Sequence, residues 1–348
     1  MTTSRGEVRP ANAPPPFDRR EWLAYAATFG SAFLAAQGLA PADAEAQPSA
    51  KPASAAPVKR YDMKKSINLW AFPYPQQMSL RECFQLAKDA GFDAVEVNFA
   101  LEGDICPATS EADLKAIGST ARQIGIEISG VCSFLYWPYS LTGNDPAKRA
   151  KGLELTRQMI AAAEALGTPN LLVVPGAVYI PWLKEAEPVP NDVCDQRARE
   201  AIRAVLPDAR KAGVSLNMEN IFTNGFLFSP GEMISFVDGF NDDHVGVHFD
   251  TGNIMQYQFP EHWIRILGKR TRNVHFKESS KAVHEFSLDT FRTLLDGTTN
   301  WPAVISALDD VGYRGYLTFE YFHPFQHWPE TLVYQTSEAL DLMLGKRA

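Results

Sequence analysis

From Lys64 onward, short apolar runs alternate with longer amphipathic segments, and this alternation limits the possible folds more than any other feature of the sequence. The apolar runs have the length of β-strands, and the segments between them have helical periodicity and mostly end at glycine. The predicted strands are residues 67–71, 94–99, 126–132, 171–174, 214–219, 245–250, 273–277 and 316–320. The predicted helices are residues 79–90, 110–124, 145–166, 192–212, 230–239, 260–267, 301–311 and 330–344. Almost entirely apolar strands, each followed by a helix, are typical of a parallel sheet covered by helices.

Eight strand–helix units close most naturally into a (β/α)8 TIM barrel. The predicted fold class is therefore α/β, with a single catalytic barrel domain over residues 64–348. A doubly wound open sheet is the alternative architecture. It is disfavoured because no Gly-x-Gly-x-x-Gly motif follows the first predicted strand.

The overall charge narrows the possible partners. The chain of 348 residues has 33 lysines and arginines against 41 aspartates and glutamates, a formal net charge of −8. Binding to a nucleic-acid backbone or to an anionic membrane surface needs clustered basic residues. We therefore expect a small-molecule substrate and no nucleic-acid partner, and the sequence leaves a homo-oligomer open.

The N-terminal segment has a different composition and is expected to lie outside the barrel. An Arg-Arg pair at 19–20 precedes an apolar run at 24–39, and the triplet 44–46 has the small-x-small form of a cleavage site. This order predicts a twin-arginine-like signal peptide over residues 1–46, and with it export to the periplasm. The apolar run is too short to span a bilayer core of about 30 Å comfortably, so we expect no stable membrane anchor. A flexible linker is predicted for residues 47–63.

Four consecutive predicted strands end in residue types that bind metal ions. The fifth strand ends in Glu219 and the sixth in Asp250, and the seventh and eighth carry His275 and Glu320. The carboxyl ends of the strands of a parallel barrel meet at the face where active sites lie. Since side chains alternate with period two along a strand, all four residues can point inward. The inward residues one layer below, expected to support the ligands, are Asn217, His248, Asn273 and Thr318.

Buried carboxylates repel one another unless a positive charge neutralises them, and a divalent cation does so. Three oxygen ligands and one imidazole favour Mn²⁺, Mg²⁺ or Co²⁺ over a structural zinc site built from thiolates. We therefore predict a divalent metal ion held by Glu219, Asp250, His275 and Glu320. Mn²⁺ is the first choice, with Mg²⁺, Co²⁺ or Zn²⁺ as alternatives.

The segments around these four residues resemble the motifs of the sugar phosphate isomerase/epimerase superfamily, which has xylose isomerase-like TIM barrels. The matching segments are residues 218–220, 249–253, 273–277 and 318–320, and the resemblance covers residues 64–345. It implies a metal-dependent isomerase or epimerase of a ketose or keto-sugar, in which Glu219 and Glu320 are also the acid/base pair. Removal of the proton α to the carbonyl gives an enediolate, and reprotonation on the opposite face or on the neighbouring carbon gives the product.

The chain departs from the free-ketose 3-epimerases of this superfamily at three substrate-contact positions. Those enzymes have a histidine, a glutamate and an arginine where this chain has Asn253, Gly225 and Lys281. The resemblance therefore implies the metal ligands more firmly than the substrate contacts. The residues expected to bind substrate are Lys277, Lys281, Asn253, Trp70 and Trp137.

Other functions stay open at this point. An exported enzyme would meet few sugar phosphates, so the substrate could be an unphosphorylated keto-sugar. On a 3-keto-glycoside, the same proton abstraction would expel a glycosidic leaving group, which is a lyase reaction. A non-catalytic sugar-binding protein is the alternative from another class. Endonuclease IV shares this barrel, but seven histidines and a net negative charge argue against its histidine-rich zinc site and basic DNA-binding face.

Overall fold

The computed structural model describes residues 59–222, 224–281 and 290–347. Within these ranges a closed parallel barrel is formed, with the strand order β1-β10-β7-β6-β5-β4-β3-β2. Its strands are β1 (Lys64–Asn68), β2 (Ala94–Asn98), β3 (Glu127–Cys132), β4 (Asn170–Val173), β5 (Ser215–Glu219), β6 (Val245–Asp250), β7 (Thr271–Phe276) and β10 (Tyr316–Phe319). The predicted TIM barrel is thereby confirmed.

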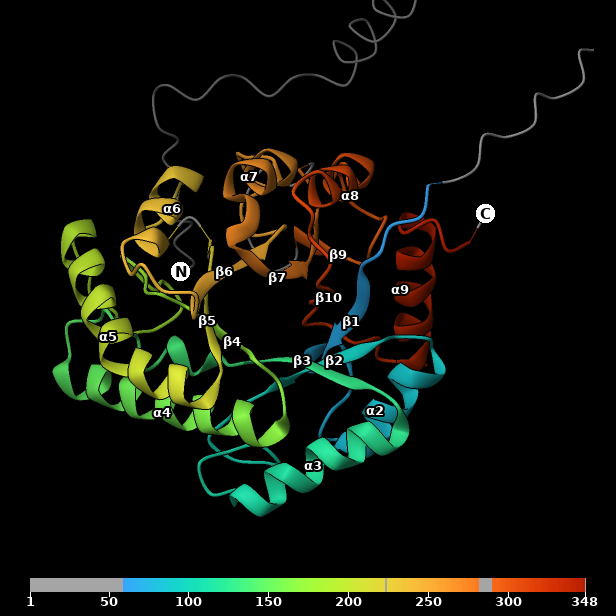
Figure 1. The fold of residues 1–348 in the computed structure, drawn as a ribbon, viewed down its shortest axis with the longest axis horizontal. Coiled ribbons are helices and arrows are strands. Elements are labelled where there is room, and N and C mark those ends of the chain that lie inside the picture. Colours follow the sequence, from blue (N-terminus) through green and yellow to red (C-terminus); the bar gives the residue numbers. More distant parts are fainter. Residues whose placement is uncertain (1–58, 223, 282–289, 348) are drawn as a thin grey trace, which may run out of the picture. The chain divides into compact units, whose positions relative to one another are not determined.

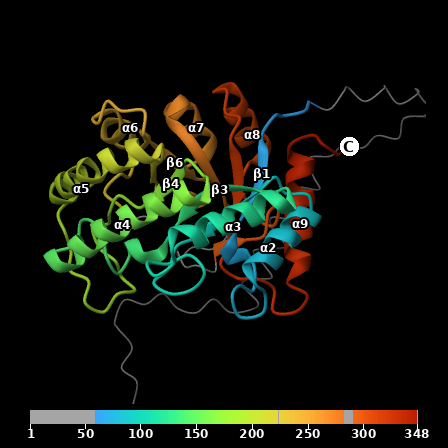
Figure 2. The same cartoon turned by 60° about the horizontal axis from the view of Figure 1, so that its bottom comes forward.

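Helices surround the barrel on its outer side (Figure 1). They are α2 (Leu80–Asp89), α3 (Glu111–Ile124), α4 (Pro146–Leu166), α5 (Asn191–Ala212), α6 (Pro230–Asp238), α7 (Pro260–Leu267), α8 (Trp301–Asp310) and α9 (Glu330–Met343). The turned view shows α2, α3 and α4 lying side by side across one flank of the barrel (Figure 2). Each barrel strand is thus followed along the chain by a helix that covers its outer face.

Local capping chemistry explains why the helix boundaries were predictable to within a residue or two. Ser79 and Glu82 form a reciprocal capping box at the start of α2, and Ser229 does the same with Glu232 at the start of α6. At the other end, Gly125 and other glycines adopt the left-handed conformation that closes a helix, with φ of 82° at Gly125.

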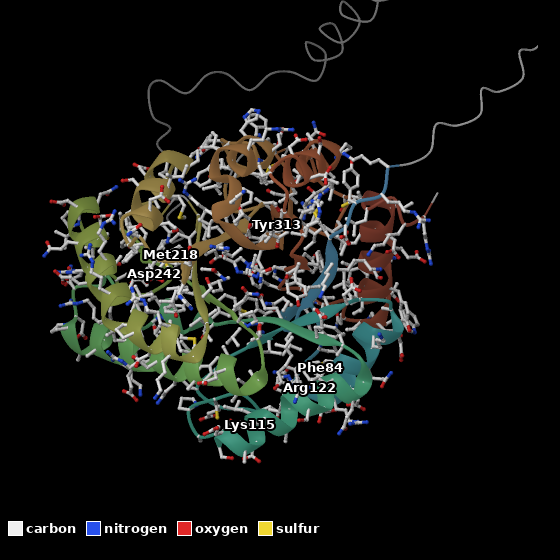
Figure 3. All side chains as sticks on the ribbon, in the orientation of Figure 1. Phe84, Lys115, Arg122, Met218, Asp242 and Tyr313 are labelled. Carbon is white, nitrogen blue, oxygen red and sulfur yellow. The ribbon has the colours of Figure 1, made fainter. Side chains whose placement is uncertain are left out.

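The core lies between the barrel wall and the helices. Met218 in β5 and Phe84 in α2 are buried there, whereas Lys115 and Arg122 lie exposed on the outer helix α3 (Figure 3). Because side chains alternate along β5, Met218 faces the helices and its neighbour Glu219 faces the barrel axis. In β5 the apolar side chain therefore packs against the helices, and the charged side chain lies inside the barrel.

The first strand differs from its prediction. Residues 67–71 were expected to be the strand, but β1 is Lys64–Asn68 and a 3-10 turn, η1 (Leu69–Ala71), follows it. The turn begins at Asn68 because its side-chain oxygen accepts a hydrogen bond of 2.8 Å from the backbone N–H of Trp70. A short antiparallel pair, β8 (Glu278–Ser279) with β9 (Phe291–Arg292), was not predicted.

The predicted signal peptide, residues 1–46, lies outside the described residues, and so does most of the predicted linker, residues 47–63. The last residues of that linker segment are described and contact the barrel unit. The backbone N–H of Tyr61 donates a hydrogen bond of 3.1 Å to the carbonyl of Leu344. Met63 is buried. Within the described ranges, every helix is too short or too polar to cross a bilayer.

Candidate metal centre and substrate cavity

The four predicted metal ligands lie together at the carboxyl ends of four neighbouring strands. Glu219 ends β5, Asp250 ends β6, His275 lies in β7, and Glu320 directly follows β10. Asp250 pairs directly with His275 across the sheet. One ligand atom from each of the four residues can be chosen so that all lie within 4.8 Å of one another. The structure therefore brings the four predicted ligands together.

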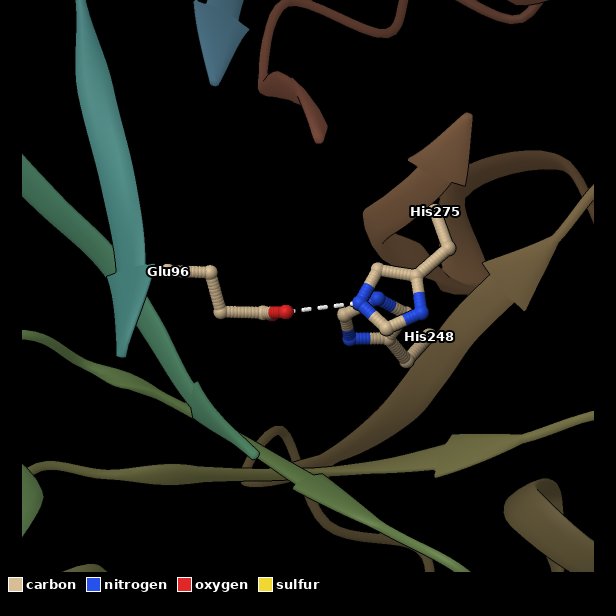
Figure 4. A group of neighbouring side chains, drawn as sticks. All are labelled: Glu96, His248 and His275. Atoms are coloured by element: carbon tan, nitrogen blue, oxygen red, sulfur yellow. Dashed lines mark hydrogen bonds and ion pairs between the residues drawn. The ribbon is translucent and has the colours of Figure 1, made fainter. Parts of the chain in front are cut away.

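The two ring nitrogens of His275 have different surroundings. Nε2 lies 2.7 Å from a carboxylate oxygen of Glu96, the contact drawn as a dashed line in Figure 4. Nδ1 has no hydrogen-bond partner among the described residues. It faces oxygens of Glu320, Glu219 and Asp250 at 3.4, 3.6 and 3.7 Å.

The protonation of Glu96 fixes the tautomer of His275. Burial opposes ionisation of Glu96, but the charge and hydrogen bond of His275 outweigh it and lower the pKa of Glu96 to about 2. An ionised carboxylate only accepts hydrogen bonds, so Nε2 of His275 carries the hydrogen. Burial lowers the pKa of His275, but the charges of Glu320 and Glu96 outweigh burial and raise that pKa well above its usual value, so the metal-free ring is protonated at both nitrogens. A cation bound between the three carboxylates would replace the proton at Nδ1 and accept its lone pair.

The dimensions and chemistry of the cluster fit a divalent cation. Ligand atoms bound at about 2.0–2.6 Å to one ion lie within ~5 Å of each other, and the cluster meets this limit. Asp250 and His275 are fully buried, and Glu219 and Glu320 are 7% and 4% exposed. Three carboxylate oxygens and one imidazole nitrogen are suitable ligands for such an ion.

The three carboxylates of the cluster differ in proton affinity. Burial, together with the charges of Asp250 and Glu219, raises the pKa of Glu320 to about 7, although Lys277 and His275 oppose the shift. Burial also raises the pKa of Glu219. For Asp250 burial acts in the same direction, but Lys277 and His275 outweigh it, so its pKa is lowered. Glu320 can therefore exchange a proton near neutral pH, and the pKa of Glu219 is shifted in the same direction.

Lys277 and Asn253 complete the inner polar cluster. The ammonium group of Lys277 lies 2.8 Å from Asp250 Oδ2, forms an ion pair with Glu320, and donates a hydrogen bond of 2.9 Å to Asn253 Oδ1. Burial lowers the pKa of Lys277, but Asp250, Glu320 and Glu219 outweigh this, so the net shift is upward. The lysine therefore stays charged beside the metal ligands.

The predicted supports of the ligands are only partly in place. The His248 ring packs edge-on against His275 with centroids 4.1 Å apart (Figure 4). In the described structure Asn217, Asn273 and Thr318 make no hydrogen bond to a ligand side chain, so the prediction fails for them. Residues two positions apart on a strand are separated by about 6.6 Å, which is too far for the short side chains of asparagine and threonine to reach the ligand groups.

The residues that do hold the ligands were missed from the sequence. Glu96 bonds His275, and Asn68 in turn donates a hydrogen bond of 2.6 Å to Glu96. Asn220 bonds the backbone of Asp250 in both directions at 2.8 Å. The charged residue Glu96 inside the mostly apolar strand 94–99 was the available signal, since an inward glutamate in a barrel wall needs a partner.

A cavity of about 790 Å³ reaches the candidate metal ligands. Glu219 and Glu320 line it, whereas Asp250 and His275 do not. Its inner end also carries Asn253 and Lys277. Most of the remaining wall is aromatic or aliphatic, which is the usual composition of a small-molecule site. The two glutamates are thus the ligands that a bound substrate can reach.

The sequence matches the family model described as xylose isomerase-like TIM barrel over residues 84–341. This range contains Glu96 and all four ligands. The chain belongs to this family. The match begins after β1, so the family model does not include the strand that closes the barrel against β10.

Several proteins of known activity are similar to this family member. It is 26% identical over 251 residues to the L-ribulose 3-epimerase of Mesorhizobium japonicum, covering 71% of this chain and 76% of the relative. It is also 26% identical over 187 residues to the L-ribulose-5-phosphate 3-epimerase UlaE of Escherichia coli K12, covering 52% of this chain. That match spans 63% of the length of UlaE.

Solved structures share the fold of this family member. A structure of L-ribulose 3-epimerase superposes with a TM-score of 0.68 at 20% identity, covering 82% of this chain and 95% of the other. A D-psicose 3-epimerase crystallised in the presence of D-fructose gives a TM-score of 0.67 at 20% identity, covering 81% and 100%. At this level of identity the likeness is one of fold.

Four of the five predicted substrate-binding residues line the cavity, and the fifth does not. Trp70, Trp137, Asn253 and Lys277 line the cavity. Lys281 does not line it: its ammonium group donates to the carbonyl of Gln258 at 3.3 Å and lies 3.6 Å from the ring centroid of Phe259. The position of Lys281 therefore gives no support to a substrate contact.

Proposed function

We propose that this protein is a divalent-metal-dependent epimerase or isomerase of a keto-sugar that works through an enediolate. The chain is an enzyme of the isomerase class, related to named sugar epimerases. In the proposal, Glu219, Asp250, His275 and Glu320 hold the cation. Glu219 and Glu320 also form the acid/base pair.

One observation carries the proposal. Of the four ligands, the two glutamates line the cavity and have raised pKa values, while Asp250 and His275 lie behind them. Along the barrel, the strand of Glu219 and the strand of Glu320 are separated by β6 and β7, which carry the other two ligands. The glutamates therefore approach the cavity from two sides, as proton transfer on opposite faces of a substrate carbon requires.

The residues of the chain divide the chemistry between them. A divalent cation bound here supplies polarisation of the substrate carbonyl and compensates the negative charge of the enediolate. One glutamate accepts the proton α to the carbonyl, and the other donates a proton to the opposite face. The charged ammonium of Lys277 would hold Asp250 and Glu320 in position and add positive charge beside the developing oxyanion.

Hydrogen exchange in D₂O tests the proposal. The metal-loaded protein should exchange the α-hydrogen of a keto-sugar in a panel of ketoses, their phosphates and 3-keto-glycosides, followed by NMR. Glu219→Gln and Glu320→Gln should each slow the exchange by about 10²–10⁴-fold. Glu154→Gln, on the exposed face of α4, is the matched control and should leave the rate unchanged.

The proposal would be wrong if the metal-loaded protein exchanged no substrate of the panel. If the sugars bind equally well to the wild type and to Glu219→Gln and no exchange occurs, the protein is a binder and not an enzyme.

A lyase reaction on a 3-keto-glycoside is the second candidate, because the cavity extends well beyond the metal ligands. The base would remove the proton at C2, next to the C3 carbonyl. The electron pair would form the C1–C2 double bond as the C1–O bond breaks, and the leaving oxygen would take a proton from the acid. Release of the aglycone, followed by NMR in the same panel, separates this reaction from epimerisation.

The identity of the metal and the location of the enzyme complete the proposal. Mn²⁺ remains our first choice of cation because the ligand set is dominated by carboxylate oxygens. We also propose that residues 1–46 direct export to the periplasm, which favours an unphosphorylated substrate. Among the described residues that line the cavity, Lys277 is the cation, and carboxylates already surround it.

A further inference from the structure

The outer part of the cavity has two aromatic walls. Trp70, Phe134 and Phe322 form one cluster, with ring centroids 4.0, 5.3 and 5.5 Å apart. Trp137, Trp182 and Phe222 form the other, with centroids 4.9 and 6.3 Å apart. All six residues line the cavity. They come from loops that follow different strands, so the walls depend on the barrel and not on local sequence.

Each wall starts beside the metal centre and ends at the protein surface. The ammonium group of Lys277 lies 5.2 Å from the ring centroid of Phe322 and 5.6 Å from that of Phe222. At the outer ends, Phe134 is 46% exposed and Trp182 is 49% exposed. A ligand whose reacting carbons lie at Glu219 and Glu320 would therefore extend outward between aromatic faces.

The polar groups of the outer cavity are mostly engaged with the protein. The hydroxyl of Tyr74 donates to Asp104 at 2.9 Å, and that of Ser133 donates to the carbonyl of Phe99 at 2.7 Å. Among the described lining residues there is no cation apart from Lys277. Residues 282–289, which lie outside the described ranges, include no lysine or arginine. A phosphate group would find few partners here, because phosphate recognition relies on arginine, lysine or converging backbone N–H groups.

We propose that the two aromatic walls form a subsite for an apolar or aromatic group attached to the keto-sugar, so that the substrate class is a glycoside and not a free or phosphorylated ketose. This inference rests on the proposed function only in placing the sugar ring at the metal centre. Aromatic faces gain from burying apolar surface and from ring stacking, neither of which a phosphate provides. The volume of about 790 Å³ lies in the range of sites for drug-sized ligands.

Binding of unreactive glycosides tests the subsite without any turnover. Methyl, phenyl and 4-nitrophenyl β-glucosides, cellobiose and glucose 6-phosphate would be titrated into the metal-loaded protein and followed by ligand-observed NMR. The aryl glucosides should bind about 10–100-fold more tightly than the methyl glucoside, which is the gain from burying a phenyl-sized group. Glucose 6-phosphate should bind no better than the methyl glucoside.

Variants of the exposed wall residues test whether the aromatic walls cause the preference for aryl glucosides. Trp182→Ala and Phe134→Ala should reduce the aryl preference several-fold while changing methyl glucoside binding less than about twofold. Trp182→Phe should keep most of the preference, because an aromatic face remains. Trp328 is an exposed tryptophan outside the cavity lining, so Trp328→Ala is the control and should change the affinity for neither ligand.

The subsite would be refuted if methyl and aryl glucosides bound equally well, or if cellobiose or glucose 6-phosphate bound more tightly than the aryl glucosides. An equal loss of affinity for the methyl and aryl glucosides in Trp182→Ala would also refute it. The result is independent of hydrogen exchange. An aryl preference without exchange would retain the subsite and overturn the proposed function, and exchange without an aryl preference would do the reverse.

Discussion

At the scale of single residues, His275 links the metal centre to the rest of the barrel. Its Nδ1 faces three carboxylates, and its Nε2 donates to Glu96, which Asn68 holds in place. A carboxylate partner of this kind orients a metal-binding imidazole and strengthens it as a ligand. Glu96 lies 179 positions from His275 in the sequence and would act on a bound metal through this imidazole.

Glu96→Gln tests this role. Glutamine keeps the shape of the side chain but removes its charge, so we expect metal affinity to fall about 10–100-fold while the fold is retained. Isothermal titration with Mn²⁺ and the absorption spectrum of the Co²⁺-loaded protein report the change. Glu261→Gln, a buried glutamate on α7, is the control. Unchanged affinity and an unchanged Co²⁺ spectrum would show that Glu96 does not position His275.

The raised pKa of Glu320 predicts that metal affinity depends on pH. In the metal-free protein this pKa is about 7, raised mainly by burial. Below it Glu320 is protonated, and the proton must leave before the carboxylate can bind a cation. Affinity should therefore rise as pH increases through this range.

Calorimetry in buffers of different ionisation enthalpy counts the released protons. Metal binding should release more protons at about pH 6 than at about pH 8. In Glu320→Gln this difference should become smaller, because the variant has no carboxyl proton to release at this position. Equal proton release at both pH values would contradict the assignment.

At the scale of elements, the sequence predicted the helices more accurately than the first strand and the loops. Helix ends depend on residues such as Ser79 and Gly125, whose capping bonds are local. The end of β1 was misplaced because Asn68 turns the chain there, and the contacts of Asn68 include Glu96, a residue on another strand. The β8–β9 pair was missed because two-residue strands leave no periodic signal.

Packing between α3 and α4 gives a prediction at this scale. A Cβ atom on Gly118 would overlap the carbonyl oxygen of Leu166, the last residue of α4. Helix propensity alone would make Gly118→Ala stabilising by about 1 kcal/mol. The overlap with backbone atoms should outweigh this and destabilise the protein by about 1–3 kcal/mol in denaturant unfolding. Ser119→Ala on the same helix should lie within about 0.5 kcal/mol of the wild type, and a stabilised Gly118→Ala would refute the close contact.

At the scale of the whole molecule, the order of the strands explains what could be read from the sequence. Glu219, Asp250, His275 and Glu320 end strands that are consecutive along the chain and adjacent in the barrel, so their convergence followed from the fold. The aromatic walls were predicted only in part: Trp70 and Trp137 were expected at the substrate site and line the cavity, whereas Trp182 and Phe322 were not expected there. Trp70, Trp182 and Phe322 lie on loops after different strands, and only the folded barrel shows which of them line one cavity.

Export of the chain is also tested at this scale. In a bacterium with a twin-arginine pathway, the periplasmic protein should begin at Gln47, which mass spectrometry of the intact chain measures. Replacing the pair at 19–20 by two lysines should keep the protein in the cytoplasm and uncleaved. The same change at Arg5 and Arg9 is the control and should leave export intact. A full-length periplasmic protein, or export of the 19–20 variant, would contradict the signal assignment.

The most direct test of the central claim is the position of the bound metal. Anomalous diffraction from crystals soaked in Mn²⁺ should show one strong peak per chain, within about 2.6 Å of Glu219, Asp250, His275 Nδ1 and Glu320. The peak should disappear in Asp250→Asn crystals soaked at the same concentration. The absence of a peak at these four residues, or a peak at another site that survives in Asp250→Asn, would contradict the metal centre on which the proposed chemistry depends.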